Sequence, residues 1–188
     1  LRHVYADRLL TVQPRDGGLA AVAVNDSAAA WSAPAVARRI SFDGTVLAEA
    51  ELVFDIDPRG ASTFSLPAGV AEPVDAANEL IVVESEGVRG LWFFAEHRDS
   101  RLARAELTAS ARRVATGFEV TIEAATLVRD IALLVDKVDP EAMVDDMLVT
   151  LLPGETVTFH VRSNWDGEPE RFCAPNVLRT SNQLVADW

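Results

Sequence analysis

The segment from 118 to 123, Phe118-Glu119-Val120-Thr121-Ile122-Glu123, decides the fold class of this chain. Its apolar and polar side chains alternate strictly, and a period of two residues is typical of a β-strand with one buried and one solvated face. The same alternation recurs in residues 156–162 and 52–57, whereas helical spacing never lasts comparably. The sequence therefore predicts an all-β protein.

Glycine-containing turns divide the chain into short strands, at Asp16-Gly17-Gly18, Asp43-Gly44, Arg59-Gly60, Glu86-Gly87, Thr116-Gly117 and Pro153-Gly154. Such pairs supply the positive φ that tight connections between antiparallel strands require. In the first half of the chain we predict seven strands, near residues 8–14, 19–26, 35–42, 45–56, 62–67, 79–85 and 88–96. In the second half we predict five, near residues 105–113, 117–125, 127–135, 147–152 and 155–162.

This pattern predicts two tandem immunoglobulin-like β-sandwich domains. Seven strands fit a sandwich over residues 1–99, and five fit a smaller sandwich over residues 100–166. Residues 97–101 contain no apolar side chain and fit a linker. A single helical turn can start at Asp139-Pro140-Glu141, because Pro is tolerated at the first helical position. Residues 167–188 are predicted to form a C-terminal tail packed on the surface.

The composition excludes several classes of partner. The chain of 188 residues has 17 Lys and Arg against 29 Asp and Glu, which gives a net charge of −12. That charge repels nucleic acid and anionic lipid. The longest apolar run, residues 19–24, is far shorter than the ~20 residues that a membrane-spanning helix needs. We therefore expect neither a nucleic-acid partner nor a membrane partner.

The N-terminal residues and the cysteine content bear on the cellular compartment of the protein. The chain begins Leu1-Arg2-His3 without the features of a signal peptide, and we interpret it as a piece of a longer protein. Cys173 is the single cysteine, so an intrachain disulfide is impossible. These features favour a cytoplasmic location.

Few side chains are candidates for chemistry. The three histidines, His3, His97 and His160, lack the spacing that puts two ligands on one side of a metal. Cys173 has no neighbouring base that would activate it as a nucleophile. We therefore expect no catalytic residue, no metal site and no cofactor.

Acidic residues crowd one predicted loop, at Asp136, Asp139, Glu141, Asp145 and Asp146. Oxygen-rich loops can hold Ca²⁺, but this spacing is not that of an EF-hand, and a solvated acidic loop is the favoured interpretation. Nor do any two carboxylates in the sequence stand out as the acid and nucleophile of a glycosidase.

Four tryptophans, at positions 31, 92, 165 and 188, are the residues best suited to stack on a sugar ring. Trp92 lies in the apolar segment Gly90-Leu91-Trp92-Phe93-Phe94 and is predicted to be in a core. Trp31 and Trp165 lie in polar sequence. We interpret both as half-buried loop anchors, with contact to a carbohydrate ligand as the alternative.

Three segments, in this order, resemble the C-terminal end of bacterial β-mannosidases of glycoside hydrolase family 2: YADRLLTVQP (5–14), GLWFFAEHRD (90–99) and DDMLVTLLPGE (145–155). The resemblance implies a multidomain enzyme with a jelly roll, a sandwich, a (β/α)₈ barrel that holds the catalytic glutamates, and two C-terminal sandwiches. This chain resembles those last two domains. No residue here matches the motifs around the catalytic glutamates, so no catalytic residue is carried over.

Two hypotheses about function follow. In the first, the chain is a non-catalytic accessory part of a β-mannosidase, inactive alone, which supports the catalytic barrel in cis. The parent enzyme would then bind the β-mannoside, and apolar surface left bare in the separate chain would favour self-association. In the second, the chain is a stand-alone carbohydrate-binding or adhesion module of two immunoglobulin-like domains. A small free-standing enzyme is disfavoured, because no convergent acid, base and nucleophile is visible in the sequence.

Overall fold

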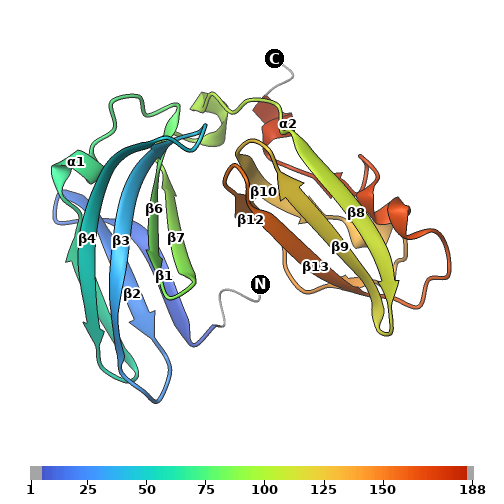
Figure 1. The fold of residues 1–188 in the computed structure, drawn as a ribbon, viewed down its shortest axis with the longest axis horizontal. Helices are drawn as coiled ribbons and strands as arrows, with labels where there is room; N and C mark the ends of the chain where they lie inside the picture. The colour runs from blue at the N-terminus through green and yellow to red at the C-terminus, as the bar shows by residue number, and fades with distance from the viewer. Residues whose placement is uncertain (1–5, 186–188) are drawn as a thin grey trace. The chain divides into compact units, whose positions relative to one another are not determined.

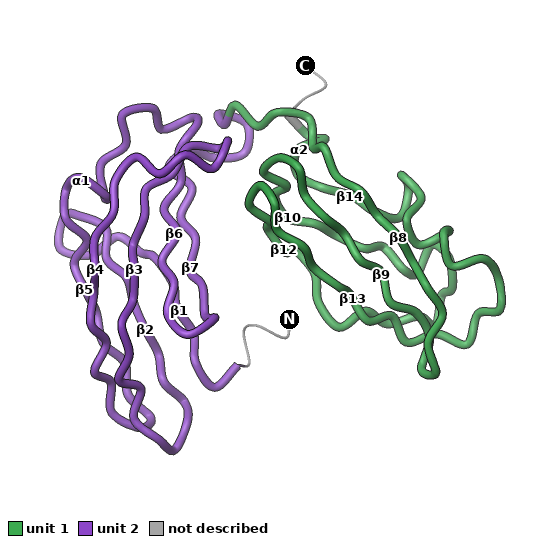
Figure 2. The backbone as a smooth tube through the Cα atoms, in the orientation of Figure 1, with its two compact units in different colours: residues 1–2, 101–188 green, residues 3–100 purple. Residues whose placement is uncertain are grey.

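In the computed structural model, residues 6–185 are described, and they form antiparallel sheets with a few short helical turns (Figure 1). This architecture confirms the predicted all-β fold of immunoglobulin-like sandwiches. The chain divides into two compact units, the first ending at Ser100 and the second beginning at Arg101 (Figure 2). Each unit has its own cluster of buried apolar side chains. No helix within residues 6–185 is long and apolar enough to cross a membrane.

The first unit packs a three-stranded sheet against a four-stranded sheet. The three-stranded sheet has the order β1-β2-β5, with β1 Arg8–Arg15, β2 Gly18–Asn25 and β5 Gly60–Ser65. The four-stranded sheet has the order β4-β3-β6-β7, with β4 Val46–Ile56, β3 Trp31–Ser41, β6 Glu79–Ser85 and β7 Val88–Phe93. Helix α1, Ala68–Ala71, follows β5. The inward-facing side chains of both sheets form the core, which includes Trp31, Phe54 and Ile81.

Gly90 brings β1 and β7 into close contact, although they belong to different sheets of the first unit. A Cβ atom at position 90 would lie 2.8 Å from the carbonyl oxygen of Leu10 and 3.1 Å from the Cα of Thr11. Real Cβ atoms do not approach backbone so closely, so only glycine fits here. The sandwich is therefore closed along the β1 and β7 side.

The second unit repeats the arrangement of three strands against four. Its larger sheet has the order β11-β13-β9-β8, with β11 Met143–Val144, β13 Thr156–Arg162, β9 Gly117–Ala124 and β8 Leu107–Val114. Its smaller sheet has the order β12-β10-β14, with β12 Val149–Leu151, β10 Val128–Leu133 and β14 Leu178–Arg179. The alternation that predicted β9 is reproduced: Phe118, Val120 and Ile122 are fully buried and belong to the core.

The stretch expected to be a surface tail is an integral part of the second unit. Phe172, in the 3₁₀ turn Pro169–Cys173, is fully buried, and Val177 and Leu178 also belong to the core. β14 pairs with β10 in antiparallel register. This stretch shows neither a two-residue nor a helical period, so its buried residues carried no pattern that the sequence could reveal.

Asn182 fastens helix α2, Asn182–Val185, to the rest of the second unit. Its buried side chain donates hydrogen bonds of 2.9 Å to the carbonyl oxygens of Ala103 and Leu127. Its Oδ1 accepts a 2.8 Å bond from the N–H of Arg129. A buried amide with these three bonds ties the end of the described chain to the beginning of the same unit.

Two local predictions are corrected. β3 begins at Trp31 rather than near residue 35; Pro34 is tolerated inside it because β6 pairs with β3 only from Val36 onward. The helical turn expected at Asp139-Pro140-Glu141 lies earlier, at Val135–Lys137. The predicted linker, residues 97–101, contains the boundary between the two units, and its first three residues form a 3₁₀ turn.

Candidate functional site

The candidate metal ligands do not come together. His97 lies in the 3₁₀ turn of the first unit, and His160 lies on β13 of the second, with its Nδ1 3.7 Å from Glu119 Oε1. His3 lies outside the described residues. Within the part of the chain that the structure describes, no group of three or more His, Cys, Asp or Glu side chains is placed to hold a metal ion.

Cys173 is half-buried at the end of the turn that carries Phe172. Burial, reinforced by the negative charge of Glu170, raises the pKa of the thiol. The thiolate is the nucleophilic form, so a raised pKa keeps Cys173 in its unreactive protonated state near neutral pH.

The acidic loop uses its carboxylates to hold turns. Asp139 accepts a 3.0 Å bond from the N–H of Glu141 and a bond from the hydroxyl of Ser163. Asp145 accepts from the N–H of His160, and Asp146 accepts from the N–H of Met147, each at 2.9 Å. These oxygens thus satisfy backbone and hydroxyl donors, as Asp side chains commonly do in turns.

Trp31 lies in the core of the first unit, not in a loop. Its side chain is fully buried, and its ring meets that of Phe54 edge-on with the centroids 5.2 Å apart. The guanidinium of Arg8 lies 5.1 Å from the centroid of the same indole. The interpretation of Trp31 as a half-buried loop anchor is therefore wrong, and its buried ring offers no face to a sugar.

Trp165 is half-buried against the core of the second unit. Its ring packs 6.0 Å from that of Phe118 and edge-on to Phe172 at 5.7 Å. The backbone at Gly167 also lies against the indole, since a Cβ there would sit 2.1 Å from its Cζ2 atom. Arg113 holds this loop with hydrogen bonds to the carbonyl oxygens of Trp165, at 2.8 Å, and Gly167, at 3.1 Å. The geometry is that of a loop anchor.

Of the two remaining tryptophans, only Trp92 lies among the described residues, and it offers no clearer platform. Trp92, on β7, is half-buried and packs against the core of the first unit. Trp188 lies outside the described residues.

Arg39 and Glu79 form a buried ion pair in the first unit that sequence reasoning missed. The nitrogen and oxygen are 2.5 Å apart, and the two side chains are 9% and 5% exposed. Arg39 also donates to the carbonyl oxygen of Gly69, while Glu79 accepts from the N–H groups of Val74 and Asp75. The sequence did carry one signal. Arg39 occupies the same alternate positions along β3 as the inward-facing Ala35 and Ala37, so its side chain faces the interior.

The electrostatics of Glu79 are those of a structural carboxylate. Burial by itself would raise the pKa of Glu79, but the bonds from Arg39 and from the two N–H groups outweigh it and lower the pKa. The pKa of Asp43 is lowered too, mainly by its bond from the Ser41 hydroxyl. A glycosidase acid needs the opposite shift, so that it is protonated near neutral pH.

We expect Glu79→Gln to lower the free energy of unfolding by about 2 kcal/mol near pH 7, because it leaves the charge of Arg39 buried without its counter-ion. The folded-state pKa of Glu79 lies below its ordinary value of 4.5. The contribution of the pair is therefore complete above that value and is lost as the pH falls through the folded-state pKa. Urea unfolding at several pH values measures this.

A matched variant, Glu86→Gln, changes a half-exposed carboxylate that pairs with Arg8 at 2.6 Å in the same unit. Surface pairs contribute little, so its effect should be under about 1 kcal/mol. Two results would contradict a stabilising role of the Arg39–Glu79 pair. One is an equal loss of unfolding free energy in both variants, and the other is a loss in Glu79→Gln that stays the same at acid pH.

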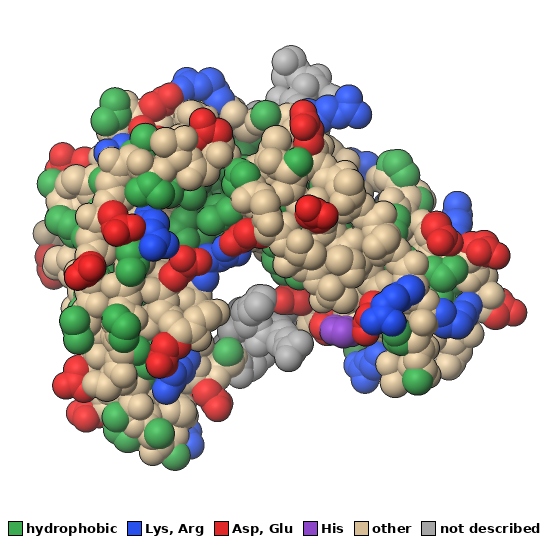
Figure 3. All heavy atoms as spheres, viewed as in Figure 1, with side chains coloured by type: hydrophobic (Ala, Val, Ile, Leu, Met, Phe, Trp, Pro, Cys, Tyr) green, Lys and Arg blue, Asp and Glu red, His purple; other side chains and the backbone are tan. Residues whose placement is uncertain are grey.

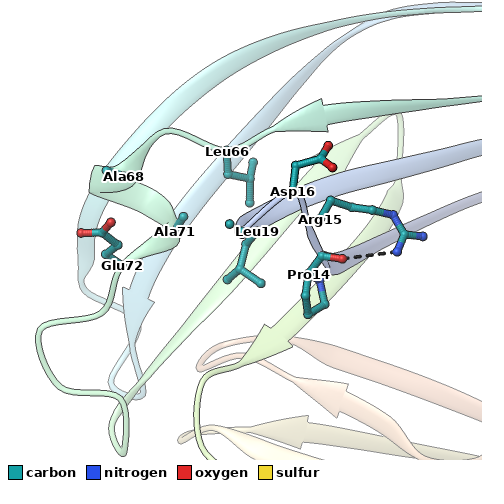
Figure 4. A pocket seen from close by; sticks show the side chains of 10 residues that line it. Pro14, Arg15, Asp16, Leu19, Leu66, Ala68, Ala71 and Glu72 are labelled. Atoms are coloured by element: carbon teal, nitrogen blue, oxygen red, sulfur yellow. Dashed lines mark hydrogen bonds between the residues drawn. The ribbon is translucent and has the colours of Figure 1, made fainter.

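An open hollow of about 640 Å³ lies beside the turn between β1 and β2 (Figure 4). Leu19, Leu66 and Ala71 form its apolar part, and the charged side chains on its rim are Arg15, Asp16 and Glu72. The guanidinium of Arg15 bonds back to its own hairpin, 2.6 Å from Gln13 Oε1 and 3.3 Å from the carbonyl oxygen of Pro14. No aromatic ring among the residues that the structure describes lines this hollow, so these residues give it no stacking surface of the kind expected of a sugar site.

These observations define the chain as a pair of immunoglobulin-like sandwich domains whose notable polar side chains hold the fold together. No protein-family model matches the chain, and no curated protein sequence matches it.

Solved structures do match. A β-D-mannosidase from Dictyoglomus thermophilum matches with a TM-score of 0.69 and 20% identity, over 87% of this chain and 20% of that enzyme. The exo-chitosanase CsxA from Amycolatopsis orientalis matches with a TM-score of 0.59 and 15% identity, over 92% of this chain and 25% of that enzyme. The matched parts are C-terminal domains, which confirms at the level of the fold the resemblance seen in the sequence. The chain thus spans a fifth to a quarter of the length of these enzymes.

Proposed function

We propose that this chain is the non-catalytic, C-terminal accessory part of a larger β-mannosidase, which removes terminal β-D-mannose residues. The observation that carries the proposal is the match of both sandwiches, over 87% of the chain, to a fifth of a β-D-mannosidase. The match to an exo-chitosanase supports a glycosidase parent more broadly. The mannoside specificity rests on the higher TM-score of the first match and on the three sequence segments.

In this proposal the chain supports the catalytic barrel of its parent in cis, and the barrel supplies the chemistry. Retaining hydrolysis requires two carboxyl groups ~5–5.5 Å apart, one of which is protonated near neutral pH. Glu79, the carboxylate buried most deeply in the first unit, is bound to Arg39 and has a lowered pKa, so it is unsuited to be that acid. A cytoplasmic location and some self-association of the separate chain belong to the same proposal.

We expect the purified chain to release no nitrophenol from 4-nitrophenyl β-D-mannopyranoside above the rate of a buffer blank. The physical reason is that hydrolysis needs a positioned acid and nucleophile, and both belong to the parent's barrel in this proposal. Release that one Asp or Glu substitution in this chain abolishes would overturn it. Release that survives every such substitution would indicate a contaminating enzyme.

The second hypothesis, a stand-alone carbohydrate-binding module, predicts binding instead. We expect titration calorimetry with manno-oligosaccharides to show no sub-millimolar affinity, because the ring of Trp31 is buried and that of Trp165 is packed against Phe118 and Phe172. Binding that Trp165→Ala removes, and that a substitution of exposed Asn176 leaves intact, would favour the module.

A further inference from the structure

The four-stranded sheet of the first unit has one edge that no other strand of the described chain covers. Its order, β4-β3-β6-β7, places β4 at one margin and β7 at the other. The β7 margin is closed by β1 at Gly90. In the second unit, Arg113 of the edge strand β8 bonds to the loop at Trp165 and Gly167. β4 pairs only with β3 among the described strands; helix α1 and β5 lie near it, and neither pairs with its outer edge (Figure 1).

The backbone of β4 is fully equipped to accept another strand. It runs from Val46 to Ile56 over 11 residues and contains no Pro, so every residue keeps its N–H donor. In an antiparallel pair, alternate residues direct their N–H and C=O groups away from the existing partner. Such a row of unpaired groups is the template for strand addition.

One face of β4 presents apolar side chains that remain incompletely covered. Ala48, Ala50 and Leu52 pack against the core of the first unit but are only partly buried. An added strand would place its own inward-facing side chains beside these three. Small apolar residues at alternate positions of the partner would complete the burial of this margin of the core.

The other face of β4 is acidic. Glu49, Glu51 and Asp55 lie on it together with Val53, whose side chain is 74% exposed, and β4 contains no Lys or Arg. Arg38 of β3 bonds to Glu49 at 2.7 Å, but it is shared with Glu84. The space-filling view shows acidic, hydrophobic and some basic side chains together on the visible face of the first unit (Figure 3).

This charge pattern selects the partner. Two copies of β4 paired edge to edge would oppose carboxylates to carboxylates, and like charges directly opposite each other destabilise a strand pair. We infer that β4 is a docking edge for an extended segment of polypeptide that alternates Lys or Arg with small apolar residues. The basic side chains lie beside Glu49, Glu51 and Asp55, and the apolar ones lie beside Ala48, Ala50 and Leu52. This inference does not depend on the identity of the parent enzyme.

The test uses the whole chain and two labelled peptides of about ten residues, one alternating Lys with Val and the other alternating Glu with Val. Fluorescence anisotropy should show the Lys peptide binding at least about tenfold more tightly, since several cross-strand charge pairs change sign together. Hydrogen exchange should show new protection of amides in residues 46–56. N-methylation of alternate peptide amides should abolish binding.

Protein variants locate the edge. Glu51→Lys should weaken the Lys peptide at least about fivefold, because it places a like charge in the acidic row. Glu123→Lys makes the same change of charge at an exposed position of β9 in the second unit and should alter affinity less than about twofold. Both sites are exposed, so thermal unfolding should show both variants folded.

Four outcomes would overturn the inference: no binding of the Lys peptide, equal binding of both peptides, protection of amides other than those in 46–56, or equal effects of the two variants. Protection of residues 46–56 that rises with protein concentration in the absence of peptide would instead identify a second copy as the occupant.

Discussion

Gly117→Ala is expected to lower the free energy of unfolding of the second unit by about 3–5 kcal/mol. Gly117 begins β9 with φ at +136°, a conformation that other residues rarely adopt. A Cβ atom there would lie 2.1 Å from the carbonyl oxygen of Val161 and 2.8 Å from the N–H nitrogen of Ser163. The cost of the unfavourable backbone conformation therefore adds to the cost of the steric clash. Both clashing atoms belong to the backbone, which cannot move away as a flexible side chain could.

Gly154→Ala is the matched control. Gly154 has φ at +84°, but no atom lies within 4 Å of a Cβ built there. This substitution should lower the free energy of unfolding by about 1 kcal/mol, which is only the cost of placing Ala in this backbone conformation. Native-state hydrogen exchange of β9 and β13 amides measures both variants. Similar losses at positions 117 and 154 would show that the β9 and β13 backbones are not as close as described.

Trp31→Ala should destabilise the first unit by about 3–5 kcal/mol, the range for removal of a large buried aromatic side chain. The indole is fully buried and packs edge-on against Phe54. Trp31→Phe should cost clearly less, because the buried Nε1 has no hydrogen-bond partner among the described residues and so no such bond is lost. Hydrogen exchange of β3 and β4 amides reports the change.

Trp92→Ala is the control for position 31, because this half-buried ring keeps part of its surface in water and should cost less than Trp31→Ala. A loss under about 1 kcal/mol for Trp31→Ala would mean that this ring is exposed, and the carbohydrate-platform interpretation of Trp31 would return.

The strands that were easiest to predict have one solvated face. β9 alternates perfectly, and its predicted and observed bounds agree within a residue, because each side chain reports the face it occupies. β14 and β11 are each two residues long, which is too short to show a periodic pattern in the sequence. They form as strands because longer strands lie beside them.

The candidate site was less predictable than the fold for the same reason. The sequence around Trp31 was interpreted as a loop, whereas the residues that decide its burial are Phe54 and the other core side chains of distant strands. Arg39 and Glu79 are 40 positions apart, so local sequence could not pair them. The turn-holding role of Asp139 and Asp146 was closer to expectation, since both bond to a backbone N–H within two residues.

Asn182 also has a topological consequence. By bonding to the carbonyl oxygen of Ala103, it brings the first residues of the second unit and the last described helix within reach of one side chain. A unit with adjacent ends can be inserted into a host loop or circularly permuted with a short linker, because joining its ends costs little chain entropy.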